Sequence, residues 1–367
     1  MEPAQACVSN HFSKKNEQIT NVGRVLIICQ WRMLSTDRSG DARVRSTQHS
    51  VYHLIQKSGD NSKMNKKMQG NLMLLITALI WGSAFVAQSV GMEYVGPFTY
   101  NMARSYIGFL VLIPVVLIFR KKRYVENPMT AEEKKVLNHN SIIGGICCGI
   151  VLCVASNFQQ FALTMTTAGK AGFITALYII IVPILGIFLG KKVPKIIWLC
   201  AAIAIFGFYL LCIKEDFSVG LGDLLGLCCA VCFSFHIMVI DHFTSKNTDS
   251  IMISCVQFLT SAVISTITML IFETPSLNAI WDARIAILYA GVLSSGIAYT
   301  LQIVAQRYTN PTVAVLLMSL ESVFAALSGW LFLHESMSAK EFTGCVLVFL
   351  AVILAQVPLP GKKGKNV

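Results

Sequence analysis

The stretch Thr309–Glu335 reads TNPTVAVLLMSLESVFAALSGWLFLHE, and the fold class follows from it. Thr309, Asn310 and Pro311 are typical of a helix start, because proline is tolerated in a first turn whose N–H groups have no partner. The 22 residues Thr312–Leu333 are apolar or small with one exception. At about 1.5 Å per residue they span a bilayer core of about 30 Å, so the stretch predicts a transmembrane helix.

The exception in that helix is Glu321, which lies about ten residues in and near the bilayer midplane. A carboxylate there costs at least about 2.5 kcal/mol, so such residues usually face a protein interior or a water-filled path. Desolvation favours the neutral acid, whereas an arriving cation favours the charged one. Glu321 is therefore a candidate site for proton coupling or for a substrate amine. The alternative is a structural acid that is hydrogen-bonded to a neighbouring helix.

A related stretch lies 144 positions earlier, at Thr166–Lys191, and reads TTAGKAGFITALYIIIVPILGIFLGK. The alignment without gaps places Leu177 on Glu321 and Lys191 on Glu335. A second pair of stretches, residues 70–81 and 222–233, aligns at a shift of 152. These pairs predict that the chain contains two copies of one membrane unit.

The composition excludes an ordinary soluble domain. Of the 367 residues, 54% are hydrophobic and 13% are charged, against about 25% charged in soluble domains. The net charge of +11 does not indicate nucleic-acid binding, because the basic residues cluster in short stretches beside apolar spans. We expect ten transmembrane helices at residues 71–90, 97–119, 141–161, 168–189, 194–213, 222–240, 249–272, 285–305, 311–333 and 340–357.

The domain organisation follows from these spans. Residues 1–65 are polar and mixed in charge, and they are either a disordered cytoplasmic tail or an overlong gene model upstream of Met64. Residues 66–213 form the first five-helix repeat and residues 222–357 the second. Residues 358–367 form a basic cytoplasmic tail.

The orientation follows from the lysines and arginines near the span ends. They gather on one side of the membrane, which the positive-inside rule makes the cytoplasmic side, so both termini are expected to be cytoplasmic. Two sets of five spans also mean that the second repeat is inverted relative to the first. The predicted fold is an all-α integral membrane protein with two inverted repeats, which is a transporter architecture.

Four pieces of the chain carry a family resemblance. They are NLMLLITALIWGSAF at 71–85, PFTYNMARSYIGF at 97–109, SNFQQFALTMTTAGKAGFITALY at 156–178 and ESVFAALSGWLFLHE at 321–335. In order and spacing, residues 70–357 resemble the ten-helix drug/metabolite transporter superfamily, specifically its EamA-type members. The resemblance implies a secondary carrier in the plasma membrane, commonly an exporter. One departure is Lys191, which stands where the family usually has an acidic residue.

Several polar and aromatic residues inside the spans are candidates for a substrate site. Arg104 could bind a carboxylate bidentately, or could instead reach the outer surface or pair within the fold. Lys170 could meet anions or reach the surface. Side-chain amides in the third and eighth spans could line a cavity or hold helices together, and two aromatic residues could form its walls. These amides and aromatic residues are Asn157, Gln159, Gln160, Gln302, Gln306, Trp81 and Tyr178.

Cofactor and metal chemistry find little support in the sequence. The stretch TTAGKAG does not match the phosphate-binding loop GxxxxGK[ST], because Thr164 and Ala171 occupy two of its defining positions. His236, Asp241 and His242 do not share one helix face at close range, so we expect no metal site. No cofactor is expected.

The predicted function is the export of a small metabolite, amino acid or drug-like solute across the plasma or inner membrane by alternating access. A proton or counter-substrate gradient would drive it, in contact with the lipid bilayer. The alternatives are a nutrient importer of the same fold, a membrane-embedded enzyme and a non-transporting scaffold. An enzyme would need paired acids, histidines or a nucleophile at a common pocket, whereas Glu321 is the one carboxylate deep inside a span.

Overall fold

The computed structural model describes residues 42–126, 128–165, 168–212, 220–332 and 338–356. It separates into two units, Met1–Lys63 and Met64–Val367, and the packing described below belongs to the second. The elements in chain order are α2 (Ala42–Met92), α3 (Pro97–Glu126), α4 (Ala131–Met165), α5 (Ala168–Thr175), α6 (Tyr178–Phe188), α7 (Lys195–Cys212), α8 (Leu221–Thr244), α9 (Ser250–Phe272), α10 (Leu277–Asp282), α11 (Arg284–Leu288), the π-helix η1 (Tyr289–Ala298), α12 (Tyr299–Gln306), α13 (Pro311–Met318), α14 (Leu320–Phe332) and α15 (Ala339–Gln356). These described ranges contain no strand, so the all-α prediction is confirmed for them.

Seven stretches of this part of the chain are long and apolar enough to cross a membrane. They are Lys66–Met92, Pro97–Glu126, Ala131–Met165, Leu221–Thr244, Ser250–Phe272, Arg284–Gln306 and Pro311–Ser328. The three other expected spans correspond to α5 with α6, to α7 and to α15. The multi-pass membrane fold is therefore confirmed, whereas the count of ten spans and the cytoplasmic termini stay predictions.

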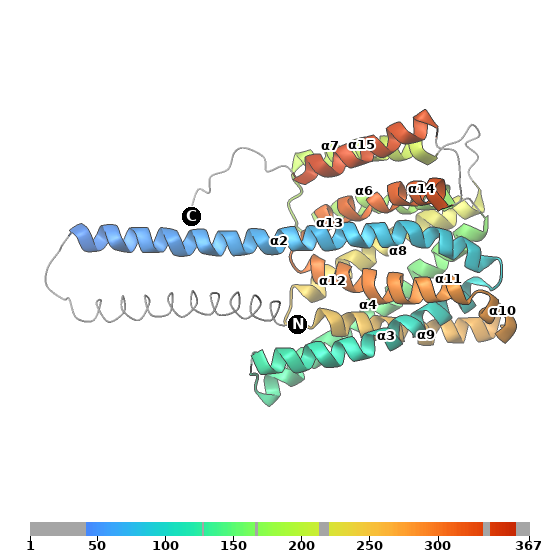
Figure 1. The fold of residues 1–367 in the computed structure, drawn as a ribbon, viewed down its shortest axis with the longest axis horizontal. Helices are drawn as coiled ribbons and strands as arrows, with labels where there is room; N and C mark the ends of the chain where they lie inside the picture. Colours follow the sequence, from blue (N-terminus) through green and yellow to red (C-terminus); the bar gives the residue numbers. More distant parts are fainter. Residues whose placement is uncertain (1–41, 127, 166–167, 213–219, 333–337, 357–367) are drawn as a thin grey trace, which may run out of the picture. The chain divides into compact units, whose positions relative to one another are not determined.

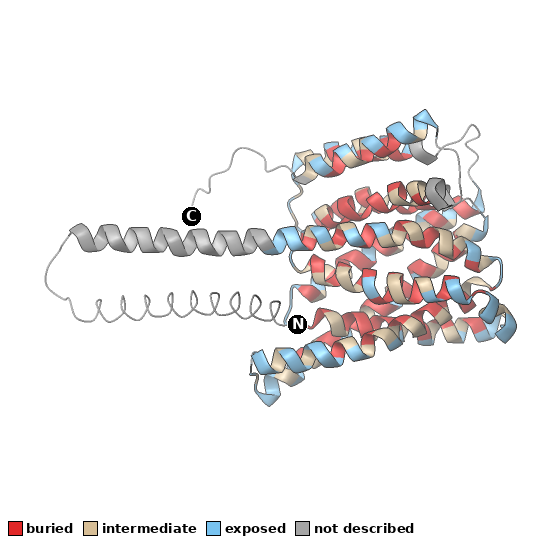
Figure 2. Ribbon diagram, in the orientation of Figure 1, coloured by how far each residue is buried: buried red, intermediate tan, exposed pale blue. Residues whose placement is uncertain are grey.

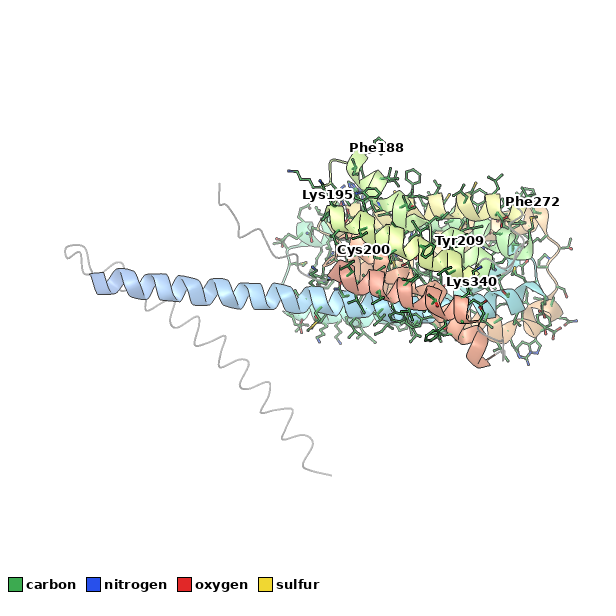
Figure 3. The ribbon with its side chains drawn as sticks, turned by 90° about the horizontal axis from the view of Figure 1, so that it is seen from above. Phe188, Lys195, Cys200, Tyr209, Phe272 and Lys340 are labelled. Atoms are coloured by element: carbon green, nitrogen blue, oxygen red, sulfur yellow. The ribbon has the colours of Figure 1, made fainter. Side chains whose placement is uncertain are left out.

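The outward faces of the helices carry large apolar side chains. Ile118 on α3 is 66% exposed and Phe272 at the end of α9 is 69% exposed. Figure 3 shows such side chains along the outside of the helices, with Phe188 and Phe272 labelled. Buried positions, by contrast, include many serine, threonine and glutamine side chains, and Figure 2 shows the buried residues in red. An apolar surface around a partly polar interior suits contact with lipid.

The two halves of the chain pack against each other through pairs of long helices. The helix α4 packs against α8 and α9, α3 packs against α9 and η1, and α7 packs against α15; Figure 1 shows α7 and α15 side by side. Glycines allow the close approach of α4 and α9. A Cβ added at Gly145 would lie 2.4 Å from the Val256 Cβ, and one at Gly149 would lie 2.6 Å from the Gln257 oxygen. Such small-residue contacts bring helices together where lipid provides little hydrophobic force.

Turns interrupt two of the expected spans near their middle. The helix α5 ends at Thr175 and α6 begins at Tyr178, while α13 ends at Met318 and α14 begins at Leu320. The sequence does not predict these turns. Backbone hydrogen bonds still cross both turns, from the Ala176 N–H to the Gly172 carbonyl and from the Ser319 N–H to the Val315 carbonyl. In transporters, interruptions of this kind within spans lie at the substrate site.

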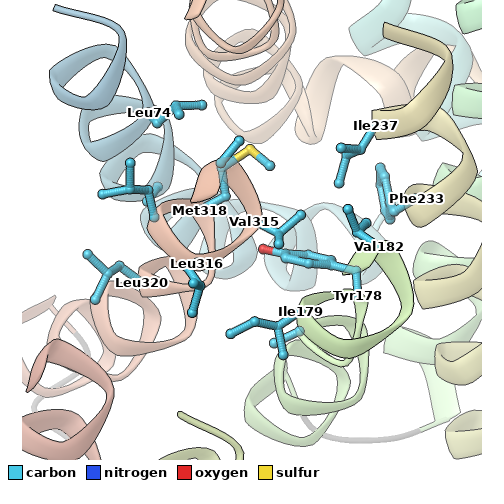
Figure 4. Packing of buried hydrophobic residues seen from close by; sticks show 14 of the residues in the cluster. Leu74, Tyr178, Ile179, Val182, Phe233, Ile237, Val315, Leu316, Met318 and Leu320 are labelled. Carbon is cyan, nitrogen blue, oxygen red and sulfur yellow. The ribbon is translucent and has the colours of Figure 1, made fainter. Parts of the chain in front are cut away.

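The largest apolar cluster packs around both breaks. Figure 4 shows Tyr178 and Ile179 of α6 near Val315 and Leu316 of α13, with Phe233 of α8 beside Val182 of α6. All of these side chains are 8% exposed or less. The cluster therefore fixes the two broken helices next to each other.

Candidate functional site

A cavity lies between the two halves of the chain, next to both helix breaks. Half of its lining residues come from before residue 213 and half from after residue 220. They are Trp81, Phe85, Gln88, Arg104, Gln159, Thr175, Tyr178, Phe233, Ile237, Ser294, Tyr299, Gln302, Met318 and Glu321. The volume of the cavity is ≈ 30 Å³, which is enough for water but too small for a metabolite. The cavity is therefore small in the described conformation.

Each broken helix presents one polar side chain to this cavity from the first turn after its break. Tyr178 is the first residue of α6 and Glu321 is the second residue of α14. The Tyr178 hydroxyl donates a hydrogen bond of 2.9 Å to Glu321 Oε1. The deep acid thus has a fixed partner on the other half of the chain.

A second contact joins the same two segments. The Ser322 hydroxyl donates a hydrogen bond of 3.4 Å to the Gly172 carbonyl on α5. Tyr178 and Ser322 are therefore both bridges between α5–α6 and α14. A movement of one broken helix against the other must break or rearrange these two bonds.

Aromatic side chains form one wall of the cavity around Tyr299. The rings of Trp81 and Tyr299 lie 4.7 Å apart between centroids. Phe258 and His236 meet the same tyrosine edge-on, at 5.5 and 6.0 Å. Aromatic walls of this kind bind the apolar body of a ligand while leaving polar groups free to orient it.

Arg104 is buried in the cavity wall without a protein partner. Its side chain on α3 is 4% exposed and faces the cavity. Within the described part of the chain, no acceptor forms a hydrogen bond or ion pair with its guanidinium. The three readings of Arg104 from the sequence, a carboxylate ligand, a position at the outer surface and a pairing inside the fold, stay predictions. A buried unpaired charge is costly, and the space beside this guanidinium is the cavity itself.

Several other wall atoms are buried without a hydrogen-bond partner. Among the described residues that line the cavity these atoms are Trp81 Nε1, Gln88 Oε1 and Gln302 Oε1. Buried polar groups are usually paired, so a cluster of unpaired ones facing a common space indicates a place for water or a polar ligand. These three atoms add one hydrogen-bond donor and two acceptors to the Arg104 guanidinium and the Glu321 carboxylate in the cavity wall.

The structure brings together six of the residues that the sequence singled out: Trp81, Arg104, Gln159, Tyr178, Gln302 and Glu321. Asn157 and Gln160 lie elsewhere. Asn157 Oδ1 accepts a hydrogen bond of 2.8 Å from Asn101 Nδ2, and Gln160 Nε2 contacts Met92 Sδ at 3.4 Å. Gln306 lines a different pocket. Lys170 lies in α5, and its side chain, like Glu335, is outside the described residues.

Sequence reasoning missed much of the cavity wall. The clearest omission is Gln88, a lone amide 4% exposed inside the first span, which the same polarity argument would have found. Apolar residues and Ser294 carried no signal in the sequence. Ser294 lies in the π-helix η1, and π-helical turns often occur at functional sites.

His236 and Asp241 contact different partners. His236 is fully buried, and its Nε2 lies 3.2 Å from Gln257 Oε1, whereas Asp241 pairs with Lys191. Across the described residues, no group of three His, Cys, Asp or Glu side chains is placed to hold a metal ion.

Comparison with known proteins gives the cavity a family context. The model of the EamA-like transporter family matches residues 68–213 and again residues 220–356. An uncharacterized transporter of Archaeoglobus fulgidus is 28% identical over 293 residues, covering 80% of this chain and 87% of that protein. The uncharacterized transporter YoaV of Bacillus subtilis (strain 168) is 23% identical over 288 residues, covering 77% of this chain and 95% of YoaV.

A solved crystal structure shares the fold. It superposes with a TM-score of 0.64 at 20% sequence identity, covering 78% of this chain and 96% of the solved one. The family match and the names of the relatives indicate a membrane transporter with a small-molecule substrate. Because the family model matches twice and spans most of the sequence, the chain belongs to the EamA-like transporter family, within the drug/metabolite transporter superfamily.

Proposed function

We propose that the protein is a secondary active transporter that exports a small polar or amphipathic metabolite, amino acid or drug-like solute by alternating access. The observation that carries the proposal is the cavity, whose wall is shared equally by the two repeats and lies at the breaks of both α5–α6 and α13–α14. Relative movement of two inverted repeats would open such a cavity to one membrane face and then to the other.

The proposed coupling residue is Glu321. When its carboxylate is ionised, the hydrogen bond from Tyr178 is charge-assisted, and such bonds are about twice as strong as neutral ones. Protonation or an arriving solute cation would weaken this bond between α6 and α14. Binding of a proton or a solute cation to Glu321 would thus control how readily the two halves move. A proton or counter-substrate gradient could drive transport through this control.

The proposed solute carries an anionic group. The unpaired guanidinium of Arg104, with Gln88 and Gln302 beside it, supports recognition of a carboxylate or a similar group. The aromatic wall of Trp81 and Tyr299 supports an apolar or planar body next to that group.

The function is tested by an untargeted comparison of metabolites in cells and medium. The protein, its Glu321→Gln variant and an empty vector are compared at matched membrane levels. We expect a compound with an anionic group to fall in cells and rise in medium with the wild type only. Accumulation of a compound inside the cells would instead identify an importer and overturn the proposed direction.

A further inference from the structure

A second pocket lies beyond the ends of α8 and α12. Its free volume is ≈ 340 Å³, which is much larger than that of the central cavity. It is lined by Lys191, Asp241, Thr244, Ser245, Gln306, Arg307, Tyr308, Thr309, Asn310 and Pro311. Nine of these ten residues come from the second repeat, and Lys191 comes from the first.

The second pocket neighbours the central cavity along two helices. On α8, Ile237 lines the cavity and Asp241 lines the pocket; on α12, Gln302 lines the cavity and Gln306 lines the pocket. Residues four apart in a helix lie on one face, about 6 Å apart along the axis. The pocket therefore lies one helical turn beyond the cavity on two separate helices.

Gln306 provides an unpaired polar group between the two spaces. Its side chain is 3% exposed, and neither its Nε2 nor its Oε1 has a hydrogen-bond partner. With Gln302 Oε1, which is also unpaired, it forms a short row of amides on α12. Buried amides without partners are costly, and a polar solute or water passing along α12 would satisfy them in turn.

An ion pair joins the two repeats at this pocket. Lys191 Nζ contacts Asp241 Oδ2, and the two side chains are 35% and 21% exposed. The position of Lys191 is set by the end of α6: Gly190 has a φ of 75°, and the Lys191 N–H donates to the Gly186 carbonyl. Only glycine adopts this left-handed conformation without strain. The backbone thus directs the lysine toward α8.

The two ends of α6 therefore hold the two contacts that a moving α6 must break. Tyr178 at its start bonds to Glu321, and Lys191 beyond its end pairs with Asp241. We propose that the second pocket is the vestibule through which a small polar solute passes between the central cavity and the membrane face at Lys191, and that the Lys191–Asp241 pair closes it. This inference rests on the proposed function, because it assigns a path to the same solute site.

The vestibule is tested by the labelling rate of a cysteine introduced at Gln306. Gln306→Cys is placed in the full chain, alone, with Lys191→Ala, and with the charge exchange Lys191→Asp plus Asp241→Lys. Membrane vesicles of both orientations are treated with a membrane-impermeant maleimide. The unmodified protein gives the background from native thiols, of which the nine described ones are all free and are buried or half-buried.

We expect Lys191→Ala to raise the labelling rate of Gln306→Cys about two- to fivefold, the range that a partly exposed ion pair supports. The charge exchange should return the rate toward that of Gln306→Cys alone, and labelling should occur from one membrane face. Ala204→Cys on α7, a fully buried position, controls for general opening of the fold.

Equal rates with and without Lys191→Ala would overturn the vestibule, as would a parallel rise at Ala204→Cys. Solute flux is measured separately on the same vesicles. If the labelling rates change as expected but the wild type moves no solute, the proposed function is wrong. If the wild type moves a solute but Lys191→Ala leaves the labelling rate unchanged, only the vestibule is wrong.

Discussion

At the scale of single residues, the cavity holds one carboxylate and one guanidinium that do not pair with each other. Glu321 has Tyr178 as its partner, whereas Arg104 has none among the described residues. The guanidinium nitrogens of Arg104 and the carboxylate oxygens of Glu321 lie more than 4.0 Å apart and form no ion pair. Different parts of a solute can therefore meet each charge, and the two side chains can be tested separately.

Removal of the Tyr178 hydroxyl tests the bond between the repeats. A hydrogen bond to a charged group contributes about 1.5–3 kcal/mol, so we expect Tyr178→Phe to change the flux of the exported compound by about tenfold or more while the protein stays folded. Tyr209→Phe on α7, where the side chain is 46% exposed, is the matched control and should leave the flux unchanged. Wild-type flux in Tyr178→Phe would rule out a role for this bond in transport.

Substitution of Arg104 tests recognition of an anionic group. In Arg104→Gln the solute loses a charge-assisted hydrogen bond, so its affinity should fall about tenfold or more, measured by competition in a flux assay. Arg104→Lys should retain part of the affinity, because it keeps the charge without the bidentate geometry. Arg284→Gln, at an exposed arginine, serves as the control. If esterified and free-acid forms of the solute compete equally well in the wild type, an anionic group is not recognised.

At the scale of elements, the prediction from sequence succeeds for helix existence and fails for helix continuity. Glu321 and the apolar run around it predict a span at 311–333, and a helix does lie there. The turns at Ala176–Leu177 and Ser319 contain neither glycine nor proline, so local sequence has no signal for them. The helices α6 and α13 pack against each other beside these turns, and such contacts between distant segments are not visible in local sequence.

Helix rotation explains why some polar candidates lie outside the cavity. Gln159 lines it, while Asn157 and Gln160 do not. Neighbouring positions differ by about 100° around a helix, so three amides within four residues face different directions. Without knowledge of the neighbouring helices, sequence alone cannot select the one that faces the cavity.

The contact between α4 and α9 gives a prediction about stability. An alanine Cβ at Gly149 would lie 2.6 Å from the Gln257 carbonyl, so Gly149→Ala must push the helices apart, at a cost of about 1–3 kcal/mol. We expect a lower midpoint of thermal unfolding in detergent. A Cβ at Gly220 meets nothing within 4 Å, and Gly220 is the N-cap residue of α8, a position that serine suits as well as glycine. Gly220→Ser is therefore the control and should unfold near the wild-type temperature. Equal midpoints would show that α4 and α9 have room to move.

At the scale of the whole molecule, composition and the internal repeat predict a multi-pass transporter, and the family match confirms this class. The two repeats contribute equal numbers of residues to the cavity wall, in agreement with that internal repeat. What the sequence does not contain is the direction of transport, the solute and the membrane, because these depend on the shape of an open site and on the cell.

The most direct test of the account measures solute flux in proteoliposomes under an imposed pH gradient. The purified wild type should move the exported compound at a rate that follows the gradient. Glu321→Gln should still exchange labelled for unlabelled solute but should not respond to the gradient, since it has no ionisable group at the break of α13–α14. Glu132→Gln, at an exposed acid of α4, should behave as the wild type. Full gradient-driven flux in Glu321→Gln would contradict the proposal that this carboxylate couples the movement of the two halves to transport.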